Sequence, residues 1–280
     1  MSSRRDFHFV FGLREQTEPF HVLHYLCLAS CRAVNRPRSI HFHYRHEPFG
    51  PWWEKIKPHL KLERVTHIAR GFAPARYGNS AEGRLIEQLG LGYAHEADFL
   101  RLDILLAHGG VYADMDTLFV REYPDAWFEE SFAIGEENAP PATGRISRPS
   151  LCNAVMFARA GAPFAARWRE RMAEVFDGTW NRHSCDEAAR LWAHQRGTLR
   201  VLPSVYFYRY GSSIAGLRTL LEETDRSHDD LYSVHLWAHL WWAASRTDFS
   251  AVHAGEIDEI WLRERDCTLA NLARPFLEAQ

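Results

Sequence analysis

Residues 94–120 form the stretch AHEADFLRLDILLAHGGVYADMDTLFV. Its first fifteen residues predict the strongest helix of the chain, and Gly109-Gly110 supplies a typical helix stop. The apolar run from Val111 to Ala113 predicts a very short strand, which leads directly into Asp114 and Asp116. The stretch therefore predicts a helix, a glycine turn and a short buried strand that is followed at once by two acidic residues.

The seventy residues at the start of the chain alternate between strand and helix patterns. Apolar runs that end at glycine or turn residues predict strands, and apolar side chains at steps of three and four residues predict helices. The predicted order is a strand (Phe7 to Phe11, ended by Gly12), a helix (Pro19 to Ala33), a strand (Arg38 to Arg45), a short helix (Trp52 to Leu60) and a strand (Leu62 to Ile68). This β-α-β-α-β order favours a parallel, Rossmann-like α/β sheet.

The second half of the chain adds further strands and helices and two loops. We expect loop and broken helix from Gly71 to Gly92, and a mobile loop from Ala139 to Ser150, because glycine and proline punctuate both stretches. Strands are predicted from Cys152 to Arg159 and Leu199 to Tyr208, helices from Pro163 to Phe176 and Asp186 to Arg196, and a segment dense in Trp and His from Val234 to Trp242.

Composition limits the class of protein. The chain has 280 residues, 46% of them apolar and 25% charged, with a net charge of −3. This is the balance of a globular protein, and it gives no bulk electrostatic attraction to DNA or RNA. The five cysteines are odd in number and irregularly spaced, which favours reduced, buried thiols. No secretory apolar region and no apolar run of about 18 residues occurs, so the sequence predicts a soluble, cytoplasmic protein.

Two pairs of charged residues in the opening stretch indicate a site. In a strand, Asp114 and Asp116 would point the same way, and two carboxylates this close repel unless a cation lies between them. A hard divalent ion, which usually also holds phosphates, is the natural guest. Asp98 and Arg101 share one face of the predicted helix with Leu102, which suits the wall of a site. A solvated turn with two acids and a plain helix ion pair are the alternatives.

The run Ala97-Asp98-x-x-Arg101, continued by Gly109-Gly110-Val111-Tyr112-x-Asp114-x-Asp116, resembles the DXD sugar-binding region of glycosyltransferase family 32. Weaker similarity extends to Asn153-Ala154 and to His235-Leu236-Trp237. The resemblance implies a GT-A fold, that is, a Rossmann-like mixed sheet flanked by helices in a single catalytic domain. It also implies a nucleotide-sugar donor, a divalent metal ion (Mn²⁺ or Mg²⁺) and transfer with retention of configuration.

The resemblance also assigns roles to single residues. Asp98 and Arg101 would bind donor-sugar hydroxyls, and Asn153 would touch the donor sugar. Asp114 would bridge ribose, sugar and metal, and Asp116 would ligate the metal. Phe9, Val10 and Phe11 would form the strand beside the nucleotide, and Tyr112 would lie near the base or sugar. His235 or Trp237 would close over the diphosphate, and His235 would also ligate the metal. Leu240 stands where some relatives have Ser, which leaves His239 as an alternative contact.

The expected activity is transfer of a hexose from a nucleotide-diphosphate sugar, UDP-linked, to a glycan, a glycolipid or another acceptor. We expect the nucleotide-binding part of the single domain, residues 1–280, to span about residues 1–120 and the acceptor side about 121–280. Peripheral membrane association is compatible with this activity. The aromatic segment from Val234 to Trp242 is expected either to close over the diphosphate as a lid or to pack in the core.

Three other activities are compatible with parts of the sequence. Asp114-Met115-Asp116 also looks like the nucleophile motif of haloacid-dehalogenase-like phosphatases, but that chemistry needs a downstream lysine, and none follows Lys61. That fold would also place the motif near the start of the chain. A nucleotide-sugar-binding protein without transfer activity is a second alternative, although such a protein has no need to keep all of the acids. A nucleotide-sugar hydrolase, with water as the acceptor, is the third.

Overall fold

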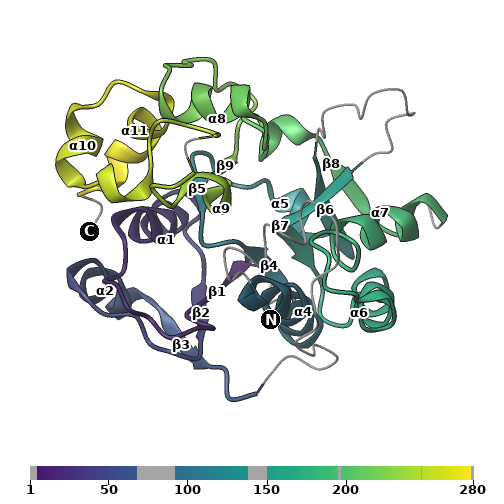
Figure 1. Cartoon of the computed structure of the whole chain (residues 1–280). Coiled ribbons are helices and arrows are strands. Elements are labelled where there is room, and N and C mark those ends of the chain that lie inside the picture. Colours follow the sequence, from purple (N-terminus) through teal and green to yellow (C-terminus); the bar gives the residue numbers. More distant parts are fainter. Residues whose placement is uncertain (1–4, 68–91, 138–149, 195–196, 247, 279–280) are drawn as a thin grey trace.

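A seven-stranded mixed sheet forms the centre of the molecule (Figure 1), in the order β3-β2-β1-β4-β7-β6-β8. The computed structural model describes residues 5–67, 92–137, 150–194, 197–246 and 248–278. Strands β1, β2, β3 and β4 run parallel, β7 is antiparallel to both β4 and β6, and β8 runs parallel to β6. The strands are β1 (Asp6–Phe11), β2 (Ser39–Tyr44), β3 (Lys61–Arg64), β4 (Gly110–Ala113), β6 (Phe132–Glu137), β7 (Ser150–Ala158) and β8 (Arg200–Leu202). The expected fold class, a Rossmann-like mixed sheet flanked by helices, is confirmed.

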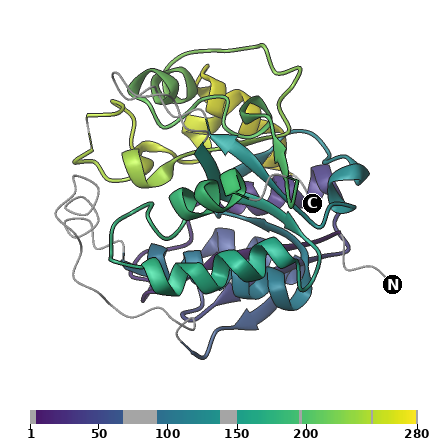
Figure 2. The same cartoon turned by 90° about the vertical axis from the view of Figure 1, so that its right-hand side faces the viewer.

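Helices cover both faces of this sheet. Helices α4 (Gly92–His108), α6 (Pro163–Val175) and α7 (Cys185–His194) pack on one face, where they share a buried apolar cluster with the sheet. On the other face a larger cluster joins the sheet to α1 (Val22–Asn35), α2 (Pro51–Ile56), α5 (Asp125–Phe128), α8 (Ile214–Leu221), α9 (Ala238–Trp241), α10 (Glu259–Glu264) and α11 (Thr268–Ala273). Figure 2 shows α8, α10 and α11, coloured green to yellow, gathered at one end of the molecule.

Smaller elements complete the chain. Strands β5 (Thr117–Phe119) and β9 (Ser233–His235) form a two-stranded antiparallel sheet, which brings the C-terminal part of the chain next to the end of β4. Short 3₁₀ helices are η2 (Lys57–His59), η3 (Ser204–Tyr206), η4 (Ala254–Glu256) and η5 (Arg274–Phe276). None of the helices in the described part of the chain is long and apolar enough to cross a membrane. All five cysteines are buried, free thiols.

The glycine turn between α4 and β4 fixes where the acidic motif lies. Gly109 and Gly110 have φ angles of +67° and +93°, a region that favours glycine. A Cβ atom on Gly110 would lie 2.4 Å from the carbonyl oxygen of Asp6. The turn therefore lets the chain leave the helix and run close beside β1, so that β4 delivers its end to the middle of the sheet.

Two predicted strands differ from the structure. The predicted strand from Leu62 to Ile68 ends at Arg64, and that from Leu199 to Tyr208 is a strand only over Arg200–Leu202. The second ends early because Pro203 has no N–H to donate to a sheet, and a 3₁₀ turn follows it. The predicted loops from Gly71 to Gly92 and from Ala139 to Ser150 lie outside the described residues except for their last residues, Gly92 and Ser150, which begin α4 and β7. The division near residue 120 stays a prediction.

Candidate active site

The two acids of the motif lie in the turn that joins β4 to β5, directly after the short strand as predicted, so the alternation of side chains along a strand does not explain how they converge. The N–H of Thr117 donates to the carbonyl oxygen of Asp114 at 3.0 Å and closes this turn. The carboxylates of Asp114 and Asp116 nevertheless converge, because both face the imidazole of His235. His235 Nε2 lies 3.1 Å from Asp116 Oδ1 and 3.8 Å from Asp114 Oδ2. The predicted metal-binding trio is thus brought together by β9, 119 residues beyond Asp116.

Backbone hydrogen bonds lock the C-terminal segment onto this turn. The N–H of Leu236 donates to the carbonyl oxygen of Asp116 at 2.8 Å, and the N–H of Ala238 donates to its side-chain Oδ2 at 2.9 Å. Trp237 between them takes a left-handed conformation, with φ of 53°, and its ring lies 4.4 Å from that of His235, edge to face. The motif and the predicted diphosphate-side segment therefore form one structural unit.

The charges of the trio shift one another's pKa values. Burial alone would raise the pKa of Asp116, but the His235 charge and hydrogen bond, together with the N–H of Ala238, hold it well below its usual range. Burial raises the pKa of Asp114; the positive charge of Arg101 only partly offsets this, and the negative charge of Asp116 adds to it. Burial would lower the pKa of His235, yet the two carboxylates outweigh it and raise that pKa. The raised pKa values of Asp114 and His235 indicate that positive charge is favoured beside the two carboxylates.

The donor set suits a divalent metal ion. Asp114, Asp116 and His235 each place one ligand atom within 4.8 Å of the others. Carboxylate oxygens and an imidazole nitrogen are ligands that Mn²⁺ and similar ions accept. Nε2 of His235 is the nitrogen that faces the acids, while its Nδ1 is buried and has no hydrogen-bond partner among the described residues. The residues present fit the ion that the sequence led us to expect.

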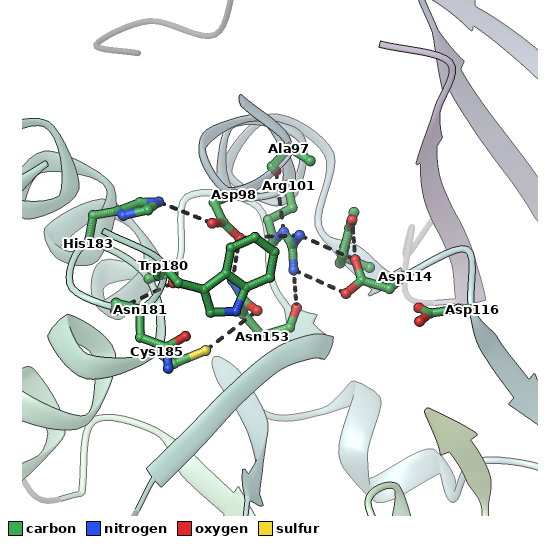
Figure 3. Close-up of polar contacts among 12 residues, drawn as sticks. Ala97, Asp98, Arg101, Asp114, Asp116, Asn153, Trp180, Asn181, His183 and Cys185 are labelled. Carbon is green, nitrogen blue, oxygen red and sulfur yellow. Dashed lines mark hydrogen bonds and ion pairs between the residues drawn. The ribbon is translucent and has the colours of Figure 1, made fainter. Parts of the chain in front are cut away.

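Arg101 joins this cluster to the donor-sugar side. Its guanidinium lies 3.3 Å from Asp114 and 3.2 Å from Asp98, and it donates to the carbonyl oxygen of Asn153 at 2.9 Å (Figure 3). The same group sits 4.7 Å above the ring of Tyr112. The predicted i, i+3 pair of Asp98 and Arg101 is therefore present, and it is buried at the wall of the site rather than at the surface.

Asp98 accepts hydrogen bonds on both of its carboxylate oxygens. Asn153 Nδ2 donates to Oδ1 at 2.8 Å, and His183 Nε2 lies 3.1 Å from Oδ2. Burial raises the pKa of Asp98, but Arg101 and His183 outweigh it and lower the pKa below its usual range. Asn153 lies on β7 and also faces Cys185, at 3.6 Å from its sulfur. Sequence reasoning did not single out His183 or Cys185, because no local spacing links them to Asp98.

The predicted nucleotide-side residues are mostly buried. The side chain of Phe9 is fully buried in the larger apolar cluster, Val10 is buried in the other cluster, and Phe11 is partly exposed. Tyr112 is also buried, and its hydroxyl donates to Asp114 Oδ1 at 2.7 Å. Contact of these four residues with a nucleotide stays a prediction, and for Tyr112 the structure adds a role in orienting Asp114.

The alternative contact His239 lies on α9, whereas His235 lies on β9. The two histidines therefore do not share one helix face, the arrangement that would let both bind a single ion. Burial lowers the pKa of His239 to about 4, and its ring packs against Trp180 with 5.1 Å between centroids. Trp241 is fully buried and its indole N–H donates to the carbonyl oxygen of Leu236 at 2.6 Å. This part of the aromatic segment is core, and closure of the remainder over the diphosphate stays a prediction.

Known proteins resemble this chain in sequence and in structure. Residues 79–133 match the model of a family described as a glycosyltransferase sugar-binding region containing a DXD motif. Glucan organizing enzyme 1 of Cryptococcus neoformans var. grubii serotype A is 26% identical over 96% of this chain and 69% of its own length. Among solved structures, PaToxG glycosyltransferase gives a TM-score of 0.46 at 14% identity, covering 69% of this chain and 70% of its own. An active-site mutant of LgtC gives 0.44 at 15% identity, covering 91% and 98%.

The family match contains Asp98, Arg101, Asp114 and Asp116, which are the residues that the structure draws into one network. This chain carries the DXD sugar-binding region of glycosyltransferases and is a glycosyltransferase, as its sequence predicted.

Proposed function

We propose that this glycosyltransferase is metal-dependent and moves a hexose, with retention of configuration, from a UDP-linked nucleotide sugar to a carbohydrate acceptor. The proposal rests on one continuous network of polar contacts, which runs from the three candidate metal ligands to the residues expected to bind the donor sugar. Asp114 belongs to the cluster with Asp116 and His235, and Arg101 bridges Asp114 to Asp98. Such a network would hold a diphosphate beside the sugar attached to it, which supports the proposal.

The chemistry of transfer explains why this arrangement is useful. Breaking the bond between sugar and phosphate develops negative charge on the departing nucleotide diphosphate. A divalent ion held by Asp116, Asp114 and His235 supplies Lewis-acid neutralisation of that charge. Arg101 adds a fixed positive charge that needs no reorganisation during the reaction, because its three partners already orient it.

The sugar side of the site is built for hydroxyl groups. The carboxylate of Asp98 is 13% exposed and is charged, so it can accept hydrogen bonds from donor-sugar hydroxyls. Asn153 beside it offers an amide with the same purpose. The name of the fungal relative, glucan organizing enzyme 1, favours a glucose-containing donor or acceptor. A glucan or a related hexose polymer is accordingly the acceptor class to test first.

Two alternatives remain worth separating by experiment: a protein that binds nucleotide sugars without transfer, and a nucleotide-sugar hydrolase. Incubation with single nucleotide sugars and Mn²⁺, with and without a glucan oligosaccharide, distinguishes all three. We expect release of nucleoside diphosphate that increases with acceptor. Release independent of acceptor would indicate a hydrolase, and binding without release would indicate a binding protein.

Metal dependence is the first prediction. EDTA should abolish the activity and added Mn²⁺ or Mg²⁺ should restore it, because the carboxylate pair needs a cation. Asp116→Asn should lower kcat by about 100-fold or more, the size of effect seen when an electrostatic group is removed from a transition state. Asp125→Asn, the same change at a carboxylate that is 82% exposed, is the control and should leave activity intact. Full activity in chelator would disprove the metal assignment.

The second prediction concerns the sugar-side carboxylate. Asp98→Asn should lower turnover while leaving the affinity for nucleoside diphosphate plus Mn²⁺ nearly unchanged, because Asp98 is not one of the three candidate metal ligands. The amide oxygen can still accept from Asn153, so the fold should persist. Arg101→Ala is a less specific test, since Arg101 also contacts Asp114. Normal turnover of a folded Asp98→Asn enzyme would remove Asp98 from the donor site.

A further inference from the structure

We infer that the turn entering α7 positions the donor-sugar pocket: His183 fixes the carboxylate of Asp98, and Cys185 fixes the amide of Asn153. The inference rests on the proposed function, since it assumes that Asp98 and Asn153 face the donor sugar. It adds two positioning residues that act through those two side chains. Both lie on one short piece of backbone, on the opposite side of Asp98 from Arg101 (Figure 3).

His183 is held rigidly. Its side chain is fully buried, stacked on Phe99 with ring centroids 5.6 Å apart and planes 15° apart. Phe176 meets it edge to face at 4.9 Å. Its own carbonyl oxygen accepts a hydrogen bond from the indole N–H of Trp168 at 3.2 Å. A ring confined on both sides and anchored through its backbone cannot swing away from Asp98 without disturbing the core.

The hydrogen-bond partners of His183 show which of its ring nitrogens carries the proton. A charged carboxylate only accepts, so the nitrogen that lies 3.1 Å from Asp98 Oδ2, Nε2, carries the hydrogen. Nδ1 is buried and has no hydrogen-bond partner among the described residues. A second proton there would leave a buried N–H without an acceptor, which is costly. His183 therefore donates one hydrogen bond, from Nε2 to Asp98, in a fixed direction.

Cys185 sets the orientation of the Asn153 amide. Its thiol lies 3.6 Å from Asn153 Oδ1, where it can donate a weak hydrogen bond. With Oδ1 turned toward the thiol, the NH₂ group of Asn153 points at Asp98 Oδ1, 2.8 Å away. Cys185 thus donates to Asn153, and Asn153 donates to Asp98. The same carboxylate also accepts a hydrogen bond from His183. The lone pairs of Asp98 that remain are the ones offered to the sugar.

A metal ion is the competing explanation for the histidine. His95, Asp98 and His183 place one possible ligand atom each within 4.8 Å of one another. This trio holds a single carboxylate, that of Asp98, which already lies 3.2 Å from the guanidinium of Arg101 and accepts a hydrogen bond from Asn153. The cluster with His235 holds two carboxylates. The geometry favours positioning, and the experiment includes a measurement that would reveal an ion.

The first arm of the experiment separates packing from hydrogen bonding at residue 183. His183→Phe keeps the aromatic contacts and removes the donor, whereas His183→Gln keeps an N–H at about the place of Nε2. We expect kcat/KM for the nucleotide sugar to fall by about 10- to 100-fold in His183→Phe, as for loss of a hydrogen bond to a charged group. His183→Gln should recover part of this loss. Calorimetry should show unchanged affinity of His183→Phe for nucleoside diphosphate plus Mn²⁺ and weaker affinity for the nucleotide sugar.

The second arm tests the thiol. Cys185→Ser keeps a donor and should behave nearly as the unaltered protein, whereas Cys185→Ala should lose a few-fold in kcat/KM, because the bond is weak. Cys31→Ala, at a thiol buried beneath the other face of the sheet, is the control and should leave kcat/KM unchanged. If His183→Phe does not fold, the Cys185 pair and His183→Gln still decide the question.

The outcomes that would overturn the inference are separate from those that would overturn the proposed function. Failure of the unaltered protein to bind any nucleotide sugar would contradict the proposed function. Binding by the unaltered protein, with equal nucleotide-sugar affinity and turnover in a folded His183→Phe, would contradict only the positioning role. One equivalent of metal retained by Asp116→Asn and lost from His183→Phe would also overturn it, because Asp98 would then be a metal ligand.

Discussion

Two side chains hold the carboxylate of Asp114 in one orientation without a bound ligand. The hydroxyl of Tyr112 donates to its Oδ1 at 2.7 Å, and the guanidinium of Arg101 lies 3.3 Å away. Tyr112 is itself fixed, because its ring lies in the core under that guanidinium. Groups of this kind, one step removed from a metal, commonly decide how well the ligand beside the metal is aimed.

Tyr112→Phe tests this interpretation at a single atom. The change removes the hydroxyl and keeps the ring, so the core and the contact with Arg101 should survive. We expect the affinity for Mn²⁺ to fall by about 10- to 100-fold, the usual effect of losing such a partner. A titration of activity, or of bound Mn²⁺, against metal concentration measures it. Tyr123→Phe is the control, because that buried hydroxyl bonds Ser233 and has no contact with the acids. Equal Mn²⁺ affinity in both variants would mean that Tyr112 is only a core residue.

At the scale of elements, two glycines with left-handed backbone differ in their surroundings: Gly109 lies in the connection from α4 to β4, and Gly161 in the connection from β7 to α6. Gly109 has φ of +67°, and a Cβ there would lie 2.7 Å from the backbone nitrogen of Ala160. Gly161 has a nearly equal φ of +71°, but a Cβ there would meet nothing within 4 Å. The two positions therefore share the conformational strain and differ in the steric clash.

Substituting alanine at both positions separates the two effects. Gly161→Ala should lower the free energy of unfolding by about 1–2 kcal/mol, the cost of placing an L residue in the left-handed region. Gly109→Ala should cost about 3 kcal/mol or more, because backbone must also move away from the new methyl group. Urea denaturation followed by circular dichroism gives both values. Similar losses in the two variants would show that the turn yields easily and that its close packing is not what positions β4.

Features of the structure could be predicted from the sequence where the residues that form them lie close together along the chain. Helix α4 and the pair of Asp98 and Arg101 depend on spacings of a few residues, and the structure confirms them. Asp114 and Asp116 were expected to converge through strand alternation, but they converge in a turn because β9 brings His235 against them. His183 is 85 residues from Asp98, and no periodicity reports a contact of that separation. Likewise β6 was missed, since its pairing with β7 depends on the tertiary fold.

At the scale of the whole molecule, folding buries histidines in a form that carries no charge. Burial lowers the pKa values of His8, His24 and His43 to about 3 each. His8 and His43 face each other across β1 and β2 with 3.1 Å between ring nitrogens. The other nitrogen of His8 lies 3.1 Å from the carbonyl oxygen of Gly109, which only accepts, so that nitrogen carries the proton. The histidine pair thus ties the strands at the centre of the sheet to the glycine turn.

These lowered pKa values make stability depend on pH in a definite direction. In the unfolded chain a histidine has a pKa near 6.5, so below that pH the unfolded state binds protons that the folded state rejects. The stabilisation from each neutral histidine is complete above about pH 6.5. It is lost as the pH falls toward 3, by about 1.4 kcal/mol per pH unit. The free energy of unfolding should therefore decrease steadily between pH 6 and pH 4.

His24→Phe isolates one such contribution. His24 stacks on Trp242 with ring planes 15° apart and meets Phe11 edge to face, contacts that a phenyl ring can reproduce. The variant should unfold with a free energy that falls less steeply with acidity, by about 1.4 kcal/mol per pH unit between pH 6 and pH 4, as expected for removal of one proton-binding site from the unfolded chain. Urea denaturation at several pH values measures the slope. His46→Phe, at an exposed histidine, is the control for removing a histidine from the surface. An identical pH slope in His24→Phe and the unaltered protein would show that His24 takes up its proton while the protein is folded, and that the interior of this fold tolerates the charge.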